Sequence, residues 1–182
     1  MTPASSMYRR DYNELRATYA PLLLTLFIVI LDQITKAIVV RTIVPIYEGG
    51  RIIEVFGEVV RLIHARNPGI AFSIGDGLPP AVRVVLFIVV PLLAMAGIGV
   101  YAWKSEEFSP LQRWFVAGIL GGGIGNIIDR IFRPAGVVDF LDVKFYGLFG
   151  LERWPTFNVA DSSVVVCGIL LVLSMFIERS EK

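Results

Sequence analysis

Apolar residues along the chain are gathered into four long runs. Residues 21–31 are uncharged, and the run continues past Asp32 and Lys36 to Val40. Residues 84–103 carry no charge, residues 114–128 are uncharged before Asp129, and residues 162–177 are uncharged before Glu178. A helix needs about 20 mostly apolar residues to cross the hydrocarbon layer of a bilayer. The pattern therefore predicts four transmembrane helices, near residues 20–40, 83–103, 113–132 and 161–178.

The segments between these runs differ in kind. The connection over residues 104–112 is short and polar, whereas residues 41–82 and 133–160 form long loops that would share the opposite face of the membrane. Residues 51–56 and 58–64 are rich in β-branched residues and are bounded by glycine and proline, as strands are. We therefore expect a membrane all-α bundle of four transmembrane helices with a small extracytoplasmic β-sheet cradle, in one integral membrane domain over residues 1–182.

Composition supports a membrane protein. Hydrophobic residues make up 55% of the 182 residues and charged residues 18%, which is too few charges for the polar shell of a soluble domain. The net charge of +1 gives no sign of nucleic-acid binding. A single cysteine, Cys167, excludes an internal disulfide, and a single histidine, His64, excludes a histidine-rich metal site. We expect no metal and no cofactor.

The first apolar run is expected to stay in the chain, because residues 32–36 do not form a small-residue cleavage site. Four spans place both termini on one side of the membrane. Lysine and arginine are denser in the termini and the 104–112 connection than in the two long loops. This distribution favours cytoplasmic termini.

Ionisable residues inside a bilayer are costly, and they usually mark function. Asp32 and Lys36 are four positions apart on a helix, so their side chains should meet. They either brace a polar cavity or form a self-contained pair. In the third span, glycines at positions 118, 121, 122 and 125 have the spacing that lets helices approach closely. Asn126, Asp129 and Arg130 follow them, either as cavity-lining groups or as side chains that reach toward the interface.

Two acids flank the second long loop. Asp139 lies between apolar residues, where desolvation would raise its pKa. Asp161 follows Asn158 at the start of the last span, where the two could serve only as a helix cap and a first-turn acid. Two carboxylates held close together share a proton, which is the aspartic-protease arrangement. The residues alone leave open which acids pair among Asp129, Asp139, Asp142 and Asp161.

Five motifs occur in an order that resembles the bacterial lipoprotein signal peptidase family, also called signal peptidase II. They are Asp32-Gln33-Ile34-Thr35-Lys36, Asn67-Pro68-Gly69-Ile70-Ala71-Phe72, Gly125-Asn126-Ile127-Ile128-Asp129-Arg130, Val138-Asp139-Phe140 and Phe157-Asn158-Val159-Ala160-Asp161. Ile70 departs from the family, which usually has alanine there. We expect this change to tune the pocket without abolishing activity.

The resemblance implies an intramembrane aspartyl endopeptidase that removes the signal peptide from diacylglyceryl-modified prolipoproteins, just before the lipidated cysteine. It implies a multi-pass protein of the bacterial plasma (inner) membrane with cytoplasmic termini and an extracytoplasmic active site. Membrane lipids and the family's cyclic-peptide inhibitors are implied partners, and we expect a monomer. The implied site comprises the catalytic Asp139 and Asp161, the substrate-binding Asn67, Gly69, Asn126, Arg130 and Asn158, and the structural supports Asp32, Lys36 and Asp129.

The residues also admit other functions. A small transporter could use Asp32, Lys36, Asp129 and Arg130 as a proton relay. A Ser-Lys peptidase could use Ser162 or Ser163 with Lys36. A subunit that only packs against partners would leave the polar motifs unexplained.

The second long loop is rich in aromatic residues. Between residues 140 and 157 these form either a lid over the site or an interfacial belt, with glycines at 147 and 150 as hinges. The aromatic residues are Phe140, Phe145, Tyr146, Phe149 and Trp154.

Overall fold

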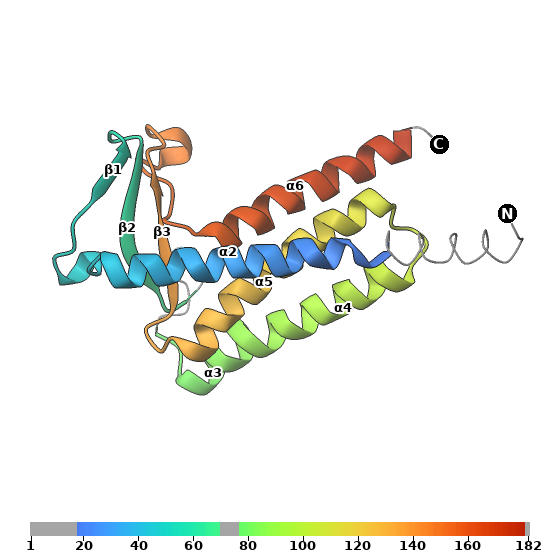
Figure 1. Ribbon diagram of the computed structural model, residues 1–182, viewed down its shortest axis with the longest axis horizontal. Coiled ribbons are helices and arrows are strands. Elements are labelled where there is room, and N and C mark those ends of the chain that lie inside the picture. The colour runs from blue at the N-terminus through green and yellow to red at the C-terminus, as the bar shows by residue number, and fades with distance from the viewer. Residues whose placement is uncertain (1–17, 70–76, 181–182) are drawn as a thin grey trace, which may run out of the picture.

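The computed structural model describes residues 18–69 and 77–180, and its main body is a bundle of four long helices (Figure 1). The first is α2 (Pro21–Thr42). The second is continuous through α3 (Pro80–Val84), the π-helical turn η3 (Val85–Val89) and α4 (Val90–Lys104). The third and fourth are α5 (Pro110–Phe132) and α6 (Val159–Ser180). All four are long and apolar enough to cross a membrane, so the predicted four-helix bundle is confirmed.

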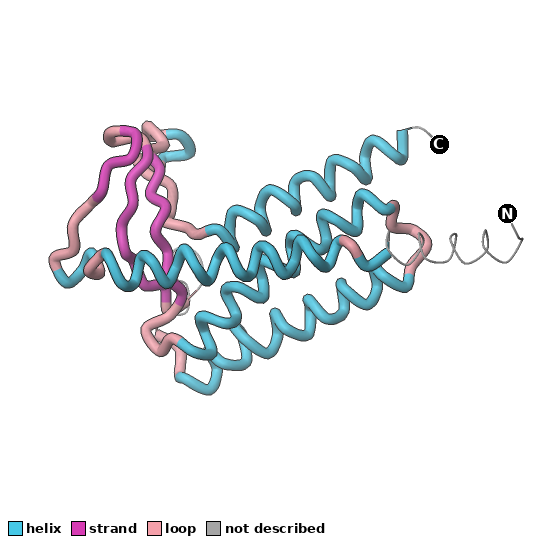
Figure 2. Tube along the Cα trace, viewed as in Figure 1, coloured by secondary structure: helices cyan, strands magenta, loops and turns pink. Residues whose placement is uncertain are grey.

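A small antiparallel sheet stands across one end of the bundle (Figures 1 and 2). Its strands are β1 (Ile53–Phe56), β2 (Val60–Asn67) and β3 (Val137–Val143), in the order β1-β2-β3. The first two strands confirm the predicted ones. The third was not predicted, because Asp139 and Asp142 were considered as candidate paired acids and not as residues of a strand.

Local sequence explains where the helices begin. Three of the four start at a proline, whose fixed φ suits the first helical turn and whose missing N–H costs nothing there. Helix α5 is also held by a capping box, in which the Ser109 hydroxyl accepts from the Gln112 backbone and the Gln112 side chain accepts from the Ser109 backbone. The second helix starts at Pro80, three residues before the predicted span.

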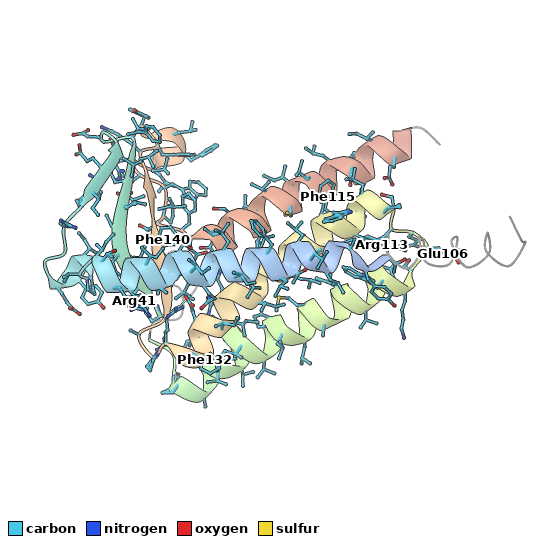
Figure 3. The ribbon with its side chains drawn as sticks, viewed as in Figure 1. Arg41, Glu106, Arg113, Phe115, Phe132 and Phe140 are labelled. Atoms are coloured by element: carbon cyan, nitrogen blue, oxygen red, sulfur yellow. The ribbon has the colours of Figure 1, made fainter. Side chains whose placement is uncertain are left out.

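The sheet packs on the last turns of α2. The buried residues Val39 of that helix and Ile43, directly after its end, contact Val138 and Phe140 of β3, and together they form the core at this end. Figure 3 shows Phe140 and Arg41 at the sheet end, with Glu106 and Arg113 at the other end of the bundle. The sheet is therefore attached to the helix bundle by an apolar contact and not only by its connecting loops.

Glycines on α5 let the neighbouring helices approach closely, as their spacing predicts. A Cβ on Gly122 would collide with the backbone oxygen of Ala160 at the start of α6. A Cβ on Gly118 would collide with the Cys167 side chain farther along α6. Because α6 carries Asp161 in its first turn, this close contact sets the position of that acid.

Residues 144–157 form a hairpin-like extension of β3. Lys144 pairs with Arg153, and the short helix η4 (Leu148–Gly150) forms the turn. The predicted hinge glycines, Gly147 and Gly150, have φ values of 78° and 76°. Such values favour glycine and fix the shape of this turn.

Candidate active site

The first acid of the site is built into the start of α6. The backbone N–H of Asp161 donates to Oδ1 of Asn158 at 2.9 Å, and the backbone N–H of Asn158 donates to Oδ2 of Asp161 at 3.2 Å. This reciprocal cap confirms the predicted capping role of Asn158. It also fixes the Asp161 carboxylate, whose charge the helix dipole favours in the first turn.

The second acid, Asp139, lies on β3 opposite Ala65 of β2. The amide of Asn67, two residues farther along β2, donates to Oδ2 of Asp139 at 3.2 Å. Gly136, just before β3, has a φ of 97°, and a Cβ there would collide with the backbone oxygen of Asn67. Glycine at this turn therefore allows β3 to start next to Asn67.

Two asparagine side chains connect the acids. The Nδ2 atom of Asn158 donates to Oδ1 of Asp139 at 2.7 Å. The Nδ2 atom of Asn126, on α5, donates to Oδ1 of Asp161 at 2.7 Å. The two amides also meet, since Asn158 Nδ2 lies 3.1 Å from Asn126 Oδ1. The structure thus brings together four of the predicted site residues, from three separate parts of the sequence.

The environment of Asp139 favours its protonated form. The residue is only 3% exposed, and burial together with the nearby Asp161 carboxylate raises the pKa of Asp139 to about 7. The amides of Asn67 and Asn158 oppose this rise, because they donate to the charged form. Asp139 therefore keeps its proton in acidic solution and loses it as the pH rises through about 7.

A buried ionic cluster lies next to the acids. Lys36 is fully buried, and its Nζ lies 2.8 Å from Asp32, 3.1 Å from Asp129 and 2.9 Å from Oδ1 of Asn126. The predicted contact between Asp32 and Lys36 is therefore confirmed. Buried charges of this kind require partners, and here two carboxylates and an amide oxygen surround one ammonium.

The same cluster ties the elements of the site together. Oδ1 of Asp32 accepts from the backbone N–H of Ala160 in α6, and Oδ2 of Asp129 accepts from that of Val138 in β3, both at 3.0 Å. Gln33 and Arg133 also contact Asp129, a role that the sequence did not reveal. The predicted supports thus connect the two elements that carry the acids.

A cavity of about 460 Å³ lies beside the acids. Arg130 lines it, and its guanidinium donates to the backbone oxygens of Asn126 and Gly69, at 3.2 and 3.1 Å. The lining of the cavity combines a few polar groups with apolar side chains, including those from α6, η3 and the hairpin: Asn67, Leu86, Phe87, Pro91, Gly123, Asn126, Ile127, Arg130, Val137, Asp139, Trp154, Pro155, Thr156, Phe157, Asp161, Val164 and Val165.

Ile70, which we expect to tune the pocket, lies outside the described residues.

Several lining residues were not identified from the sequence. Phe87 is buried in the π-helical turn η3, and Phe157 and Val164 come four residues before and three residues after Asp161 in the sequence. Short π-helical turns often occur at functional sites, but the apolar run around Phe87 gave no local sign of one. These residues add apolar surface to the cavity wall.

The serines and Asp142, which were also candidates for the site, make contacts with other residues. The Ser162 and Ser163 hydroxyls donate to backbone oxygens of Asn158 and Gly118, and neither contacts Lys36 within the residues described. Asp142 is paired with Arg61 and Arg153 and does not line the cavity. Within residues 18–69 and 77–180, no group of three or more His, Cys, Asp or Glu side chains could hold a metal ion.

A family model described as signal peptidase (SPase) II matches residues 24–177. The lipoprotein signal peptidase of Treponema pallidum is 45% identical over 163 residues, which cover 90% of this chain and 86% of the relative. That of Treponema denticola is 47% identical over 167 residues, 91% of this chain and 94% of the relative.

Two solved structures, both described as bacterial membrane enzymes determined by the in meso method, are also similar. One has a TM-score of 0.75 and 28% identity, and the match covers 90% of this chain and 91% of the other. The second has a TM-score of 0.70 and 26% identity, covering 86% and 92%.

The fold and the buried polar site define a multi-pass membrane enzyme, and the similarity to solved membrane enzymes agrees with that class. The chain belongs to the signal peptidase II family, whose model covers nearly all of its four helices and the sheet. It is therefore a membrane peptidase. This membership argues against a transporter and against a subunit that only packs.

Proposed function

We propose that this peptidase is an aspartyl endopeptidase that removes the signal peptide from diacylglyceryl-modified prolipoproteins, just before the lipidated cysteine. The substrate class follows from the relatives named lipoprotein signal peptidase, which align over most of the chain. The observation that carries the mechanism is that Asn158 contacts both Asp139 and Asp161, at 2.7 and 3.2 Å, beside one cavity.

The two acids take different roles in this proposal. Asp161 accepts from two donors and lies at a helix N-terminus, so it is the ionised base that removes a proton from the attacking water. Asp139, with its raised pKa of about 7, is the protonated acid that polarises the scissile carbonyl. After water adds, the proton taken by the base is delivered to the leaving amine.

Developing charge on the carbonyl oxygen requires further donors. Arg130 lines the cavity and carries a guanidinium, and Asn67 contributes an amide next to Asp139. Donors fixed in position before the reaction stabilise such charge at little reorganisation cost. We assign substrate binding to these two residues and to Gly69, Asn126 and Asn158.

The substrate is a membrane helix with an attached lipid, so it must reach the site sideways. The cavity wall offers apolar side chains from η3 and α6, including Leu86, Val164 and Val165. These would contact the signal helix and the acyl chains, while the acids lie at the sheet end of the bundle, where water is available. The hairpin over residues 144–157 would act as a lid.

The expected setting is the bacterial plasma (inner) membrane, with cytoplasmic termini and the sheet on the extracytoplasmic side. Water for hydrolysis would then enter from that side. Membrane lipids and the family's cyclic-peptide inhibitors would occupy the same apolar wall. One bundle contains the whole proposed site, so a monomer suffices.

The test is cleavage of a purified diacylglyceryl-modified prolipoprotein by the purified chain. We expect a single cut before the modified cysteine, and inhibition by a cyclic peptide of the type that blocks this family. The matched control is the same prolipoprotein without the lipid. Equal cleavage of both forms, or cleavage of neither, would contradict the proposal.

A further inference from the structure

Asp142 is a buried acid that the proposed chemistry does not use. Its side chain is only 5% exposed, and each of its two carboxylate oxygens accepts from an arginine side chain. Arg61 lies directly opposite on β2 and donates to Oδ2 from Nε at 2.9 Å and from Nη2 at 2.7 Å. Arg153 donates to Oδ1 at 2.6 Å. A carboxylate held in this way is an anchor and not a free acid.

Arg153 connects this anchor to the rest of the hairpin. Its Nη2 donates to the backbone oxygen of Asp142 at 3.3 Å, and its Nη1 donates to that of Glu58, between β1 and β2, at 3.1 Å. One guanidinium therefore holds β3, the β1–β2 turn and the returning arm of the hairpin together. A planar fork of donors suits this task better than a flexible ammonium would.

The next residue, Trp154, faces the cavity. Its backbone N–H donates to the oxygen of Val143 at 2.9 Å, and its ring packs on Phe145 with centroids 4.9 Å apart. Trp154 also lines the same cavity as Asp139 and Asp161. Arg153 comes directly before this wall residue, so its contacts hold the stretch of backbone that leads into Trp154.

We infer that Asp142, acting through Arg153, positions Trp154 in the cavity wall and so sets the affinity for substrate without taking part in bond cleavage. The inference rests on the proposed peptidase function. Loss of the Asp142 charge removes the ionic partner of Arg153, which keeps only its contacts with backbone oxygens, and loosens the wall where the substrate binds. The acids remain in place, because their contacts come from Asn67, Asn126 and Asn158.

The test is a double-mutant cycle between Asp142→Asn and Trp154→Ala, read by KM and kcat for a lipidated substrate. Asp142→Asn should raise KM about fivefold and change kcat by less than about twofold. In the Trp154→Ala background, the same substitution should change KM by less than about twofold, because the residue through which it acts is gone. An equal rise in both backgrounds, or no rise in either, would overturn the inference.

Two further variants keep the inference testable if Asp142→Asn fails to fold. Arg153→Gln leaves the Arg61–Asp142 pair intact and should raise KM as Asp142→Asn does. Glu152→Gln, one position earlier and 71% exposed, is the matched control and should leave both constants unchanged. An unchanged KM in Arg153→Gln would overturn the inference. Failure of the unsubstituted protein to cleave would instead count against the proposed function.

Discussion

The Nζ atom of Lys36 lies 2.9 Å from Oδ1 of Asn126. An ammonium can only donate, so this contact requires that the oxygen of the amide faces Lys36. The Nδ2 atom must then face the other way, and it donates to Asp161 at 2.7 Å. A buried cation in the first helix thus orients an amide that holds one of the two proposed catalytic acids.

Replacement of this amide tests its importance. Asn126→Ala should lower kcat about 100-fold, because Asp161 loses a donor that fixes its position. The measurement is single-turnover cleavage of a lipidated substrate. The matched control is Gln112→Ala, since Gln112 lies on the same helix, is buried, and also donates to a carboxylate, that of Glu178. Similar loss of kcat in both variants would show a general weakening of α5 and contradict the assignment.

The raised pKa of Asp139 predicts the pH dependence of activity. The acid must be protonated to polarise the carbonyl, and it loses its proton as the pH rises through about 7. The value of kcat/KM should therefore fall above that pH, by about tenfold for each further unit. A profile that stays flat to pH 9, after correction for unfolding, would refute the role of Asp139 as the acid.

The same shift predicts how stability depends on pH. The pKa of Asp139 rises from 3.8 in the unfolded chain to about 7 in the folded one, so the folded state holds this proton more tightly. Between these values the free energy of unfolding decreases as the pH rises. Asp139→Asn cannot ionise, so in detergent its Tm should decrease less from pH 5 to pH 8 than that of the unsubstituted protein. An equal decrease in both would argue against burial of this acid.

The apolar runs were sufficient to predict the four helices, because a bilayer leaves few alternatives to a helix for a long apolar segment. The third strand, β3, could not be predicted in the same way. Its sequence places acids at 139 and 142 among apolar residues, and its pairing with β2 depends on contacts more than seventy positions apart, such as Ala65 with Asp139. Only the fold reveals that these acids lie on a strand.

In the site too, local contacts could be predicted from the sequence, whereas contacts between distant residues could not. The cap formed by Asn158 and the contact between Asp32 and Lys36 are local, so their spacing predicted both. The contact between Asn126 and Asp161 spans 35 positions and depends on how closely α5 and α6 pack. Family resemblance pointed to these residues, but their mutual geometry required the structure.

That close packing can be tested at a glycine. Gly122→Ala should lower the stability by about 1–3 kcal/mol and also reduce cleavage, because its Cβ would push against Ala160 and displace Asp161. Gly168→Ala on α6 is the control, since nothing lies within 4 Å of a Cβ there. The readouts are thermal unfolding in detergent and the cleavage rate. A Gly122→Ala variant with unchanged stability and rate would contradict the packing described.

The paired acids are the central claim, and separate replacement of each acid by its isosteric amide tests it most directly. The measurement is kcat at saturating lipidated prolipoprotein for Asp139→Asn, Asp161→Asn and Asp142→Asn, each after a check that the protein is folded in the membrane. We predict that the first two lose cleavage completely, while Asp142→Asn keeps its turnover. Normal processing by either Asp139→Asn or Asp161→Asn, or loss of turnover in Asp142→Asn, would contradict the account.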